Sequence, residues 1–284
     1  MLVQVTLASR KSKLALAQTQ LVIDHFTAQE QPVQDYRVLP LATTGDRQLT
    51  WRLDKALDKG LFTQELELAL LDGRADLAVH SAKDLPTAMH PDLAIAGYLP
   101  REDSRDVLVY QTGVDEPKCL ASSSPRRRSQ GRLLFPRAGW RAIRGNVATR
   151  LQKIASGEAE GTFLAAAGLK RLGIETWPGL AFRPLPITLM TPAAGQGAIA
   201  VQCRAADVGY FRPLLDATTA TMVNMERSLL HRLGGGCHQA HAVQCCGERV
   251  LIFTEVSGHR ILPWRAVVDD TAGVLSQWGL AKGK

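Results

Sequence analysis

The strongest constraint on the fold of this chain is the order in which its apolar segments follow one another. Residues 3–8 are predicted to form a strand, residues 9–12 form a short polar loop, and apolar residues then recur at helical spacing up to Phe26. The order of strand, loop and helix returns twice, with a strand at residues 118–121 before a helix start at Ser124, and a strand at residues 140–143 before a helix that runs through Arg150. Strands that alternate with helices predict α/β domains built on largely parallel sheets.

The stretch of residues 77–86 combines a buried strand with charged groups at its end. Residues 77–79 are apolar, Lys83 and Asp84 follow, and Pro86 prevents the strand from continuing. Ligands of open α/β sheets bind beyond the carboxyl ends of the strands, so the pair is a candidate functional site. A surface ion pair worth roughly 0–1 kcal/mol is the alternative, and position alone does not decide between them.

Turns rich in proline and charge predict two crossings between domains, near residue 100 and across residues 178–192. The strand predicted at residues 198–202 then rejoins the first sheet, which makes the first domain discontinuous. The predicted domains are 1–98 with 193–216 (α/β), 99–192 (basic α/β) and 217–284 (α+β, with strands at 241–246, 250–256 and 261–268).

The net charge of +7 is concentrated in one segment. Residues 101–153 hold 12 Lys and Arg against 5 Asp and Glu, and the rest of the chain is neutral. Ser124 and Pro125 predict a helix start, so Arg126 and Arg127 fill its first turn, where cations oppose the helix dipole. Such a segment attracts a polyanion, either a nucleic acid or a polycarboxylate; a solvated charged face is the alternative.

Composition and cysteine usage predict a cytoplasmic globular protein. The first residues show no secretory signal, and no apolar run approaches the roughly 20 residues that span a bilayer. The five cysteines have no metal-like spacing, so we predict no metal site. Cys237 follows three glycines at the end of a helix predicted over residues 218–233; the glycines alone indicate only a helix end.

Several segments, in order along the chain, resemble the porphobilinogen deaminase (hydroxymethylbilane synthase) family. The matching segments are residues 59–62 (KGLF), 79–84 (VHSAKD), 101–103 (RED), 123–127 (SSPRR), 144–147 (RGNV), 167–172 (AGLKRL), 195–197 (GQG), 226–227 (ER) and 235–237 (GGC). They occur in the family's order within residues 1–237, and that shared order makes chance a poor explanation.

The resemblance implies a cytoplasmic monomeric enzyme of three domains, the first two hinged and similar to periplasmic binding proteins. It implies a transferase of porphyrin and haem biosynthesis that joins four porphobilinogen molecules into a linear tetrapyrrole, with loss of ammonia at each step. The implied cofactor is a dipyrromethane, held by a thioether to Cys237. The implied partner is the small-molecule substrate, without nucleic acid or membrane.

The chemistry of this substrate suits the residues. Loss of ammonia from porphobilinogen leaves an azafulvene-like cation, which a fixed carboxylate such as Asp84 stabilises. Each pyrrole ring carries two carboxylates, and guanidinium groups match carboxylates well. By correspondence with the family motifs, the expected roles are cofactor binding for Lys83, Ser124, Arg126, Arg127, Arg144 and Gln196, substrate carboxylate binding for Arg10, Ser12, Arg150 and Arg171, and a mobile loop at Lys59 and Phe62.

Two other classes of protein share the expected fold. A solute-binding protein would also hold an anionic ligand between two lobes, but it normally needs export and no catalytic carboxylate. A transcription regulator of this fold would carry a helix-turn-helix segment before its first sheet, whereas this sequence opens on a predicted strand. Both are weaker explanations of the motifs than the enzyme.

Overall fold

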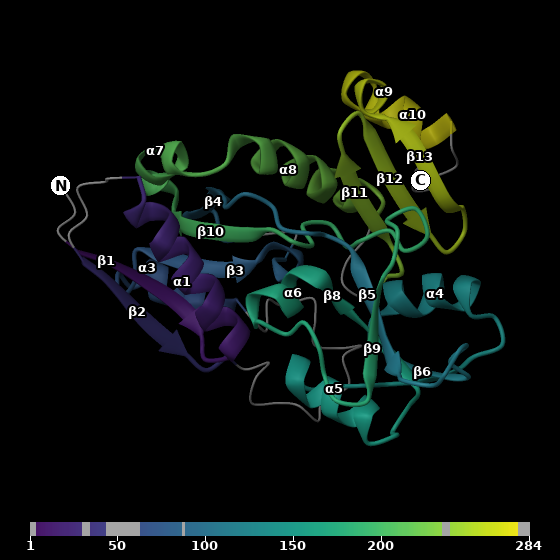
Figure 1. The fold of residues 1–284 in the computed structure, drawn as a ribbon. Helices are drawn as coiled ribbons and strands as arrows, with labels where there is room; N and C mark the ends of the chain where they lie inside the picture. The colour runs from purple at the N-terminus through teal and green to yellow at the C-terminus, as the bar shows by residue number, and fades with distance from the viewer. Residues whose placement is uncertain (1–3, 30–34, 44–62, 87–88, 235–238, 278–284) are drawn as a thin grey trace. The chain divides into compact units, whose positions relative to one another are not determined.

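The computed structural model describes residues 4–29, 35–43, 63–86, 89–234 and 239–277, and Figure 1 labels their helices and strands. The chain divides into two compact units. Unit 1 comprises residues 1–102 and 198–221, and unit 2 comprises residues 103–197 and 222–284. Domain bounds finer than these two units remain predictions.

Unit 1 is built on a five-stranded mixed sheet. Its strands, in spatial order, are β2 (Asp35–Leu41), β1 (Gln4–Arg10), β3 (Leu77–Ser81), β10 (Ile199–Arg204) and β4 (Leu93–Tyr98). β1 pairs in parallel with β2 and β3, whereas β10 runs antiparallel between β3 and β4. The predicted return of residues 198–202 to the first sheet is therefore confirmed.

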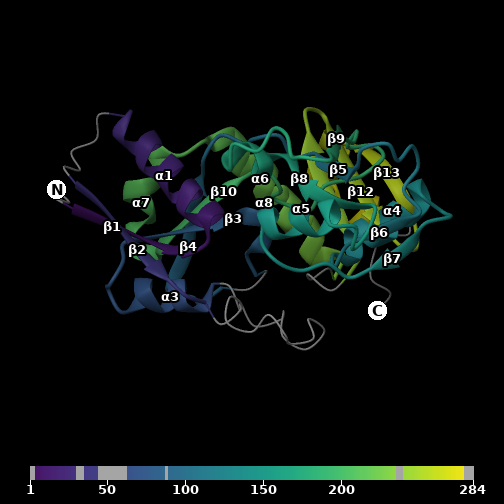
Figure 2. The same ribbon diagram turned by 60° about the horizontal axis from the view of Figure 1, so that its bottom comes forward.

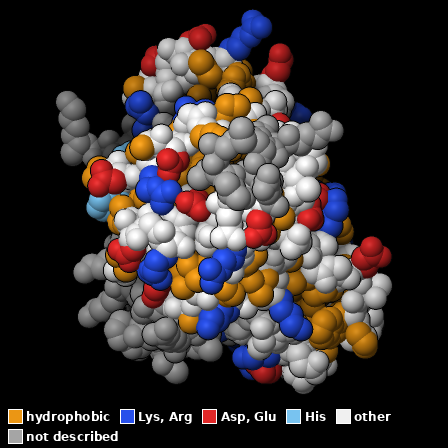
Figure 3. All heavy atoms as spheres, turned by 90° about the vertical axis from the view of Figure 1, so that its left-hand side faces the viewer, with side chains coloured by type: hydrophobic (Ala, Val, Ile, Leu, Met, Phe, Trp, Pro, Cys, Tyr) orange, Lys and Arg blue, Asp and Glu red, His pale blue; other side chains and the backbone are white. Residues whose placement is uncertain are grey.

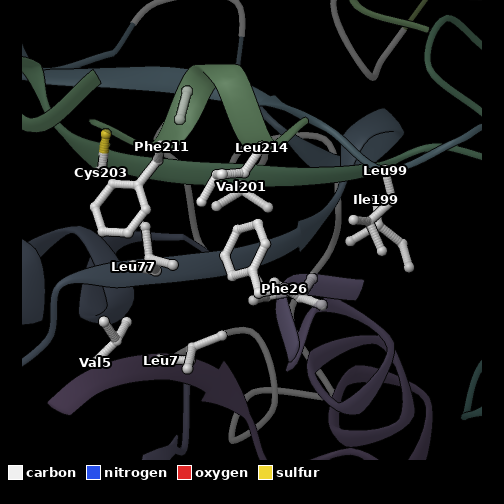
Figure 4. Packing of buried hydrophobic residues seen from close by; sticks show 13 residues of the cluster. Val5, Leu7, Phe26, Leu77, Leu99, Ile199, Val201, Cys203, Phe211 and Leu214 are labelled. Atoms are coloured by element: carbon white, nitrogen blue, oxygen red, sulfur yellow. The ribbon is translucent and has the colours of Figure 1, made fainter. Parts of the chain in front are cut away.

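Helices cover both faces of this sheet. Successive residues of a strand point to opposite sides, and the strands carry apolar side chains on each side that the helices bury. Leu7 and Leu77 pack with Phe26 of α1 (Lys13–Thr27), in the cluster shown in Figure 4. Ala8 and Ala78 instead pack against α3 (Gln64–Leu71). Figure 2 shows α1 and α7 (Val208–Phe211) on one side of the sheet and α3 on the other.

Unit 2 contains a second five-stranded mixed sheet. Its strands, in spatial order, are β7 (Gly139–Arg141), β6 (Cys119–Ala121), β8 (Gly161–Ala165), β5 (Asp106–Gln111) and β9 (Leu180–Pro184). β6 pairs in parallel with β7 and β8, and β5 runs antiparallel between β8 and β9. The sequence analysis did not predict β9, because its closing prolines indicated only a crossing between domains.

The helices of this second sheet also lie on both of its faces. They are α4 (Pro125–Leu134), α5 (Val147–Ala155) and α6 (Ala166–Arg171). Val107 and Val109 of β5 pack with α5 and α6 in one core. Leu108, between them, points into the opposite core with Phe135, at the end of α4. Two α/β sheets of this kind confirm the predicted α/β class.

The C-terminal part of unit 2 is a small α+β assembly. An antiparallel sheet of β11 (Ala242–Cys246), β12 (Arg249–Thr254) and β13 (Gly258–Pro263) packs with α8 (Ala217–Arg232), α9 (Trp264–Asp269) and α10 (Thr271–Gln277). The strand predicted over residues 261–268 is wrong beyond Pro263, because Pro263 caps α9 and the following residues are helical. Apolar residues alone do not separate a short strand from one turn of helix.

Candidate active site

A pocket in unit 1 collects three of the predicted site residues. Arg10, Ser12 and Asp84 line it together with Leu14, Ala15, Gln18, Thr63, Val79, His80 and Ser81. Arg10 closes β1, and Asp84 closes a 3-10 turn (Ala82–Asp84) that follows β3. β1 and β3 are parallel neighbours, so their carboxyl ends meet at the same edge of the sheet. Topology therefore brings a guanidinium and a carboxylate to one hollow.

Each of these groups is placed by local backbone structure. Ser12 is the N-cap of α1, and its hydroxyl accepts a hydrogen bond from the Ala15 amide at 3.2 Å. The helix N-terminus beside it favours an anion. Asp84 is exposed at the end of its turn, whereas Ala82 in the same turn is buried and anchors it through its amide to the Ala198 carbonyl at 3.1 Å. The carboxylate is therefore held at the pocket and open to a ligand.

Three polar side chains of the pocket wall, those of Gln18, His80 and Ser81, were not predicted as site residues. The Gln18 amide donates to the Ser81 hydroxyl at 2.9 Å, across the α1–β3 contact. His80 Nε2 lies 2.9 Å from Gln202 Oε1, and Gln202 Nε2 donates to Glu67 Oε1 at 3.1 Å. Because Gln202 uses its amide nitrogen for Glu67, its oxygen accepts from His80. Polar residues within an apolar strand were the available signal for His80 and Ser81.

Lys83 shares the turn of Asp84 and is half-buried. Among the described residues, the pocket lining includes Asp84 but does not include Lys83. The neighbouring charged residues Lys83 and Asp84 therefore differ in that only Asp84 lines the pocket. The cofactor-binding role of Lys83 stays a prediction.

In unit 2, the first turn of α4 forms a buried charged cluster. Ser124 is the N-cap, and Pro125 occupies the first turn. Arg126 and Arg127 are only 6% and 7% exposed, and both donate to Asp106, which is 0% exposed. The alternative of a solvated charged face is therefore wrong for these two arginines. Asp106 offsets the unfavourable placement of cations at a helix N-terminus.

Arg144 and Arg150 flank the start of α5. Asn146 caps this helix by accepting from the Thr149 amide at 2.9 Å, and Arg150 Nε donates to the Gly145 carbonyl at 2.8 Å. Gly145 has φ +114°, and a Cβ there would lie 2.6 Å from the Thr149 side chain, so only glycine fits. Through this turn, the Arg150 side chain contacts Gly145, the residue that follows Arg144.

The Gly195–Gly197 loop carries Gln196 and is held from several sides. Gln196 Nε2 donates to the Ser104 carbonyl at 2.7 Å, and Arg171 Nη2 donates to the Gly197 carbonyl at 2.5 Å. Buried Glu226 accepts from the Gly195 amide at 2.7 Å and, through its other oxygen, from the Cys245 amide at 2.8 Å. Gln196 and Arg171 therefore lie at the same loop. Neither of their sequence motifs predicts this proximity.

Cys237, Lys59 and Phe62 lie outside the described residues. Among the described cysteines, Cys203 is buried in the unit 1 core, and burial, reinforced by the nearby Asp207 carboxylate, raises the pKa of its thiol to about 11. Since the thiolate is the nucleophile, Cys203 is poorly suited to attack a substrate near neutral pH. None of the helices in the described ranges is both long and apolar enough to cross a membrane.

Comparison with known proteins identifies the family. Residues 5–210 match the family model described as "Porphobilinogen deaminase, dipyromethane cofactor binding domain". The chain is 42% identical to the porphobilinogen deaminase of Nitrosomonas europaea, over 82% of this chain and 77% of that protein. Against the enzyme of Brevibacillus brevis the identity is 40%, with coverages of 81% and 75%, and against that of Burkholderia vietnamiensis it is 40%, with coverages of 92% and 81%.

These matches decide between the three classes that the sequence left open. The family model spans the strands and helices that carry Asp84, Arg126, Arg127 and Arg144, and the relatives extend over most of the chain. The matches favour the enzyme over a solute-binding protein and over a transcription regulator. The chain belongs to the porphobilinogen deaminase family.

Proposed function

We propose that Asp84 is the catalytic carboxylate of this enzyme and that its arginines hold the carboxylates of substrate and cofactor. The reaction is that of a hydroxymethylbilane synthase, which joins four porphobilinogen molecules into a linear tetrapyrrole and releases ammonia at each step. The observation that carries the proposal is the unit 1 pocket, where Asp84 and Arg10 line one hollow at the carboxyl ends of β1 and β3.

Asp84 acts on the charge that develops in the substrate. When the C–N bond of the aminomethyl group breaks, the electron pair leaves with ammonia and positive charge spreads onto the pyrrole nitrogen. An exposed carboxylate in a turn anchored by buried Ala82 needs little reorganisation to face that charge. Electrostatic stabilisation of this kind typically contributes roughly 10²–10³ in rate.

Arg10 and Ser12 bind a carboxylate of the substrate. Arg10 supplies a guanidinium fork, and Ser12 stands at the N-terminus of α1, where backbone N–H groups and the helix dipole favour an anion. Binding at this edge of the pocket orients the ring toward Asp84. In unit 2, Arg150 and Arg171 are proposed to bind further substrate carboxylates as the chain grows.

The residues present fit a dipyrromethane, a cofactor with four carboxylates and two pyrrole N–H groups. In the α4 cluster, two buried guanidiniums lie side by side at the carboxylate of Asp106, and guanidinium groups match the geometry of ligand carboxylates. Bound dipyrromethane supplies the pyrrole carbon on which the product grows. The residues proposed to hold it are Lys83, Ser124, Arg126, Arg127, Arg144 and Gln196.

Cys237 is proposed as the covalent attachment point of the cofactor. Support comes from the Gly-Gly-Cys motif and from the burial of two of the other thiols. Cys203 is buried with a pKa of about 11, and Cys245 is buried within β11. Lys59 and Phe62 are proposed to belong to a mobile loop of the active site.

The remaining proposals concern organisation and partners. We place three domains at residues 1–98 with 193–216, 99–192 and 217–284, in a cytoplasmic monomer. Nucleic acid is not proposed as a partner, because four of the twelve cations of the basic segment are paired with carboxylates of the same segment. Arg105 bonds Asp103, Arg137 bonds Glu116, and Arg126 and Arg127 bond Asp106. Figure 3 draws the face that lies on the left in Figure 1, and lysine and arginine side chains are interspersed with aspartate and glutamate on that face.

Incubation of the purified protein with porphobilinogen tests the function. We expect porphobilinogen to be consumed with release of four ammonia molecules per linear tetrapyrrole, and an acidic aldehyde reagent for pyrroles to stain the protein itself. Binding to duplex DNA should be weak and steeply dependent on salt. Sequence-specific DNA binding at physiological salt, together with no consumption of porphobilinogen, would contradict the proposal.

A further inference from the structure

Asp106 is placed so that one carboxylate meets two consecutive arginines. It is the first residue of β5 and is fully buried. Its Oδ2 accepts from Arg126 Nη1 at 2.6 Å, and its Oδ1 accepts from Arg127 Nε at 2.9 Å and Nη2 at 2.7 Å. The bonds to Arg127 are bidentate, a geometry that fixes the plane of a guanidinium as well as its position.

The convergence of these arginines is not a consequence of the helix alone. Consecutive residues of an α-helix are rotated by about 100° about its axis, so their side chains normally diverge. Arg126 and Arg127 nevertheless reach the two oxygens of one carboxylate in the first turn of α4. The sheet supplies that carboxylate, because β5 begins beside the helix N-terminus.

A second contact holds Arg126 from another direction. Its Nη1 also donates to the Thr191 carbonyl at 2.8 Å. Gln130, which is 0% exposed, fixes the backbone of Thr191 by donating to the same carbonyl at 3.0 Å and accepting from the Thr191 amide at 2.7 Å. The orientation of Arg126 therefore depends on Asp106 and, through Thr191, on Gln130.

We infer that Asp106 is a positioning residue for cofactor loading: it orients Arg126 and Arg127 so that both can receive dipyrromethane carboxylates. The inference rests on the proposed function of these two arginines. A guanidinium has five N–H donors, so each arginine has donors beyond those directed at Asp106. Fixing a long side chain before the ligand arrives removes an entropic cost from binding. Asp106 itself touches neither substrate nor cofactor in this assignment.

The test compares two substitutions that separate charge from packing. Asp106→Asn keeps the size of the side chain and removes its charge, whereas Asp106→Glu keeps the charge and disturbs the packing. Each variant is purified from cells that make porphobilinogen. Intact-mass spectrometry measures the fraction that carries one dipyrromethane, and circular dichroism measures the melting temperature.

We expect the occupied fraction of Asp106→Asn to fall at least about tenfold, and that of Asp106→Glu to fall less. A packing role alone predicts the reverse order. Glu116→Gln is the matched control, because it removes one carboxylate from an exposed pair with Arg137 in the same unit and should leave occupancy at the wild-type level. Folded Asp106→Asn with wild-type occupancy would overturn the inference.

Gln130→Met keeps the test decisive if Asp106→Asn does not fold. This variant leaves every charge in place and removes only the two bonds that hold Thr191, so we expect a smaller loss of occupancy, about threefold. Unchanged occupancy in Gln130→Met would then overturn the inference. Wild-type protein without any dipyrromethane would instead refute the proposed function itself, which keeps the two failures distinct.

Discussion

The five-stranded sheets of units 1 and 2 share one topology and carry different chemistry. In unit 1 the strand order is β2-β1-β3-β10-β4, and in unit 2 it is β7-β6-β8-β5-β9. In each sheet the first three strands form a parallel trio with β1 or β6 as its central strand, and the fourth, β10 or β5, is antiparallel to its neighbours. In each, a serine that follows the central strand caps the next helix: Ser12 before α1 and Ser124 before α4. The scaffold thus places equivalent loops at the same edge of both sheets.

The residues in those loops make the difference between the two sheets. After the third strand of its trio, unit 1 places a short turn that ends in exposed Asp84. At the corresponding place after β8, unit 2 has α6, which ends in Arg171. After its central strand, unit 2 has two arginines neutralised in part by buried Asp106. One scaffold therefore carries an exposed carboxylate in unit 1, for which we propose the catalytic role, and several arginines in unit 2, for which we propose the binding of anionic ligands.

The largest effect is expected from the carboxylate of unit 1. Asp84→Asn should lower the turnover of porphobilinogen roughly 10²–10³-fold, because the amide cannot stabilise the developing cation. The melting temperature should stay close to wild type, since Asp84 is exposed. Steady-state kinetics on loaded enzyme measures the loss. Asp72→Asn, at an exposed carboxylate near the end of α3, is the control. A rate of porphobilinogen consumption by Asp84→Asn within threefold of the wild-type rate would contradict the catalytic role of Asp84.

Thiol reactivity contrasts the two units without any mutation. At pH 8, Cys203 of unit 1 should react with a maleimide at least about a hundredfold more slowly than Cys246 of unit 2. Cys203 is buried and its thiol has a pKa of about 11, whereas Cys246 is exposed. Peptide mapping over time measures both rates. Equal labelling in the folded protein would contradict the described core of unit 1.

Two arginines of unit 2 should differ in what they contribute to stability. Arg126→Ala removes a buried partner of Asp106 and a donor to Thr191, so we expect a loss of about 3 kcal/mol in the free energy of unfolding. Arg144→Ala, at a half-buried side chain, should cost less than about 1 kcal/mol. Urea unfolding of both variants gives the values. Equal losses would show that the Asp106 cluster is no more structural than the α5 turn.

The smallest effect is an acid sensitivity of the C-terminal part of unit 2. Burial lowers the pKa of His241 and His259 in the folded protein. Their neutral forms therefore stabilise the fold fully above the unfolded value of about 6.5, and this contribution is lost as the pH falls toward the folded values. Unfolding temperatures should drop by a few degrees between pH 8 and pH 5.5. A His241→Gln, His259→Gln variant with the same drop would contradict this origin.

Local patterns were enough to predict much of the scaffold. The strands predicted at residues 3–8 and 198–202 correspond to β1 and β10, and the Ser124-Pro125 signal located the start of α4. Local patterns failed where a tertiary contact decides the structure. β9 is a strand because it pairs with β5, and the residues after Pro263 form α9, which packs in one core with β12. Neither property is visible in apolar spacing.

The candidate site was predictable in its residue types and not in its partners. The charged end of β3 marked Asp84, and the family motifs supplied the arginines. Asp106 was not marked by any motif, and only the fold shows that it pairs with residues 20 and 21 positions later. The chain from Glu67 through Gln202 to His80 likewise joins three separate elements. Contacts between distant segments were the part that sequence alone could not supply.

The most direct test of the central claim is the mass of the intact protein from cells that make porphobilinogen. We predict an excess over the sequence mass of one dipyrromethane, located in the peptide that contains Cys237 and absent from an inactive Cys237→Ser variant. The thiolate attacks the same kind of electrophilic carbon that the substrate forms at each step, so one chemistry serves loading and growth. Fully active enzyme with unmodified Cys237, or the adduct on Cys203, Cys245 or Cys246, would contradict the claim.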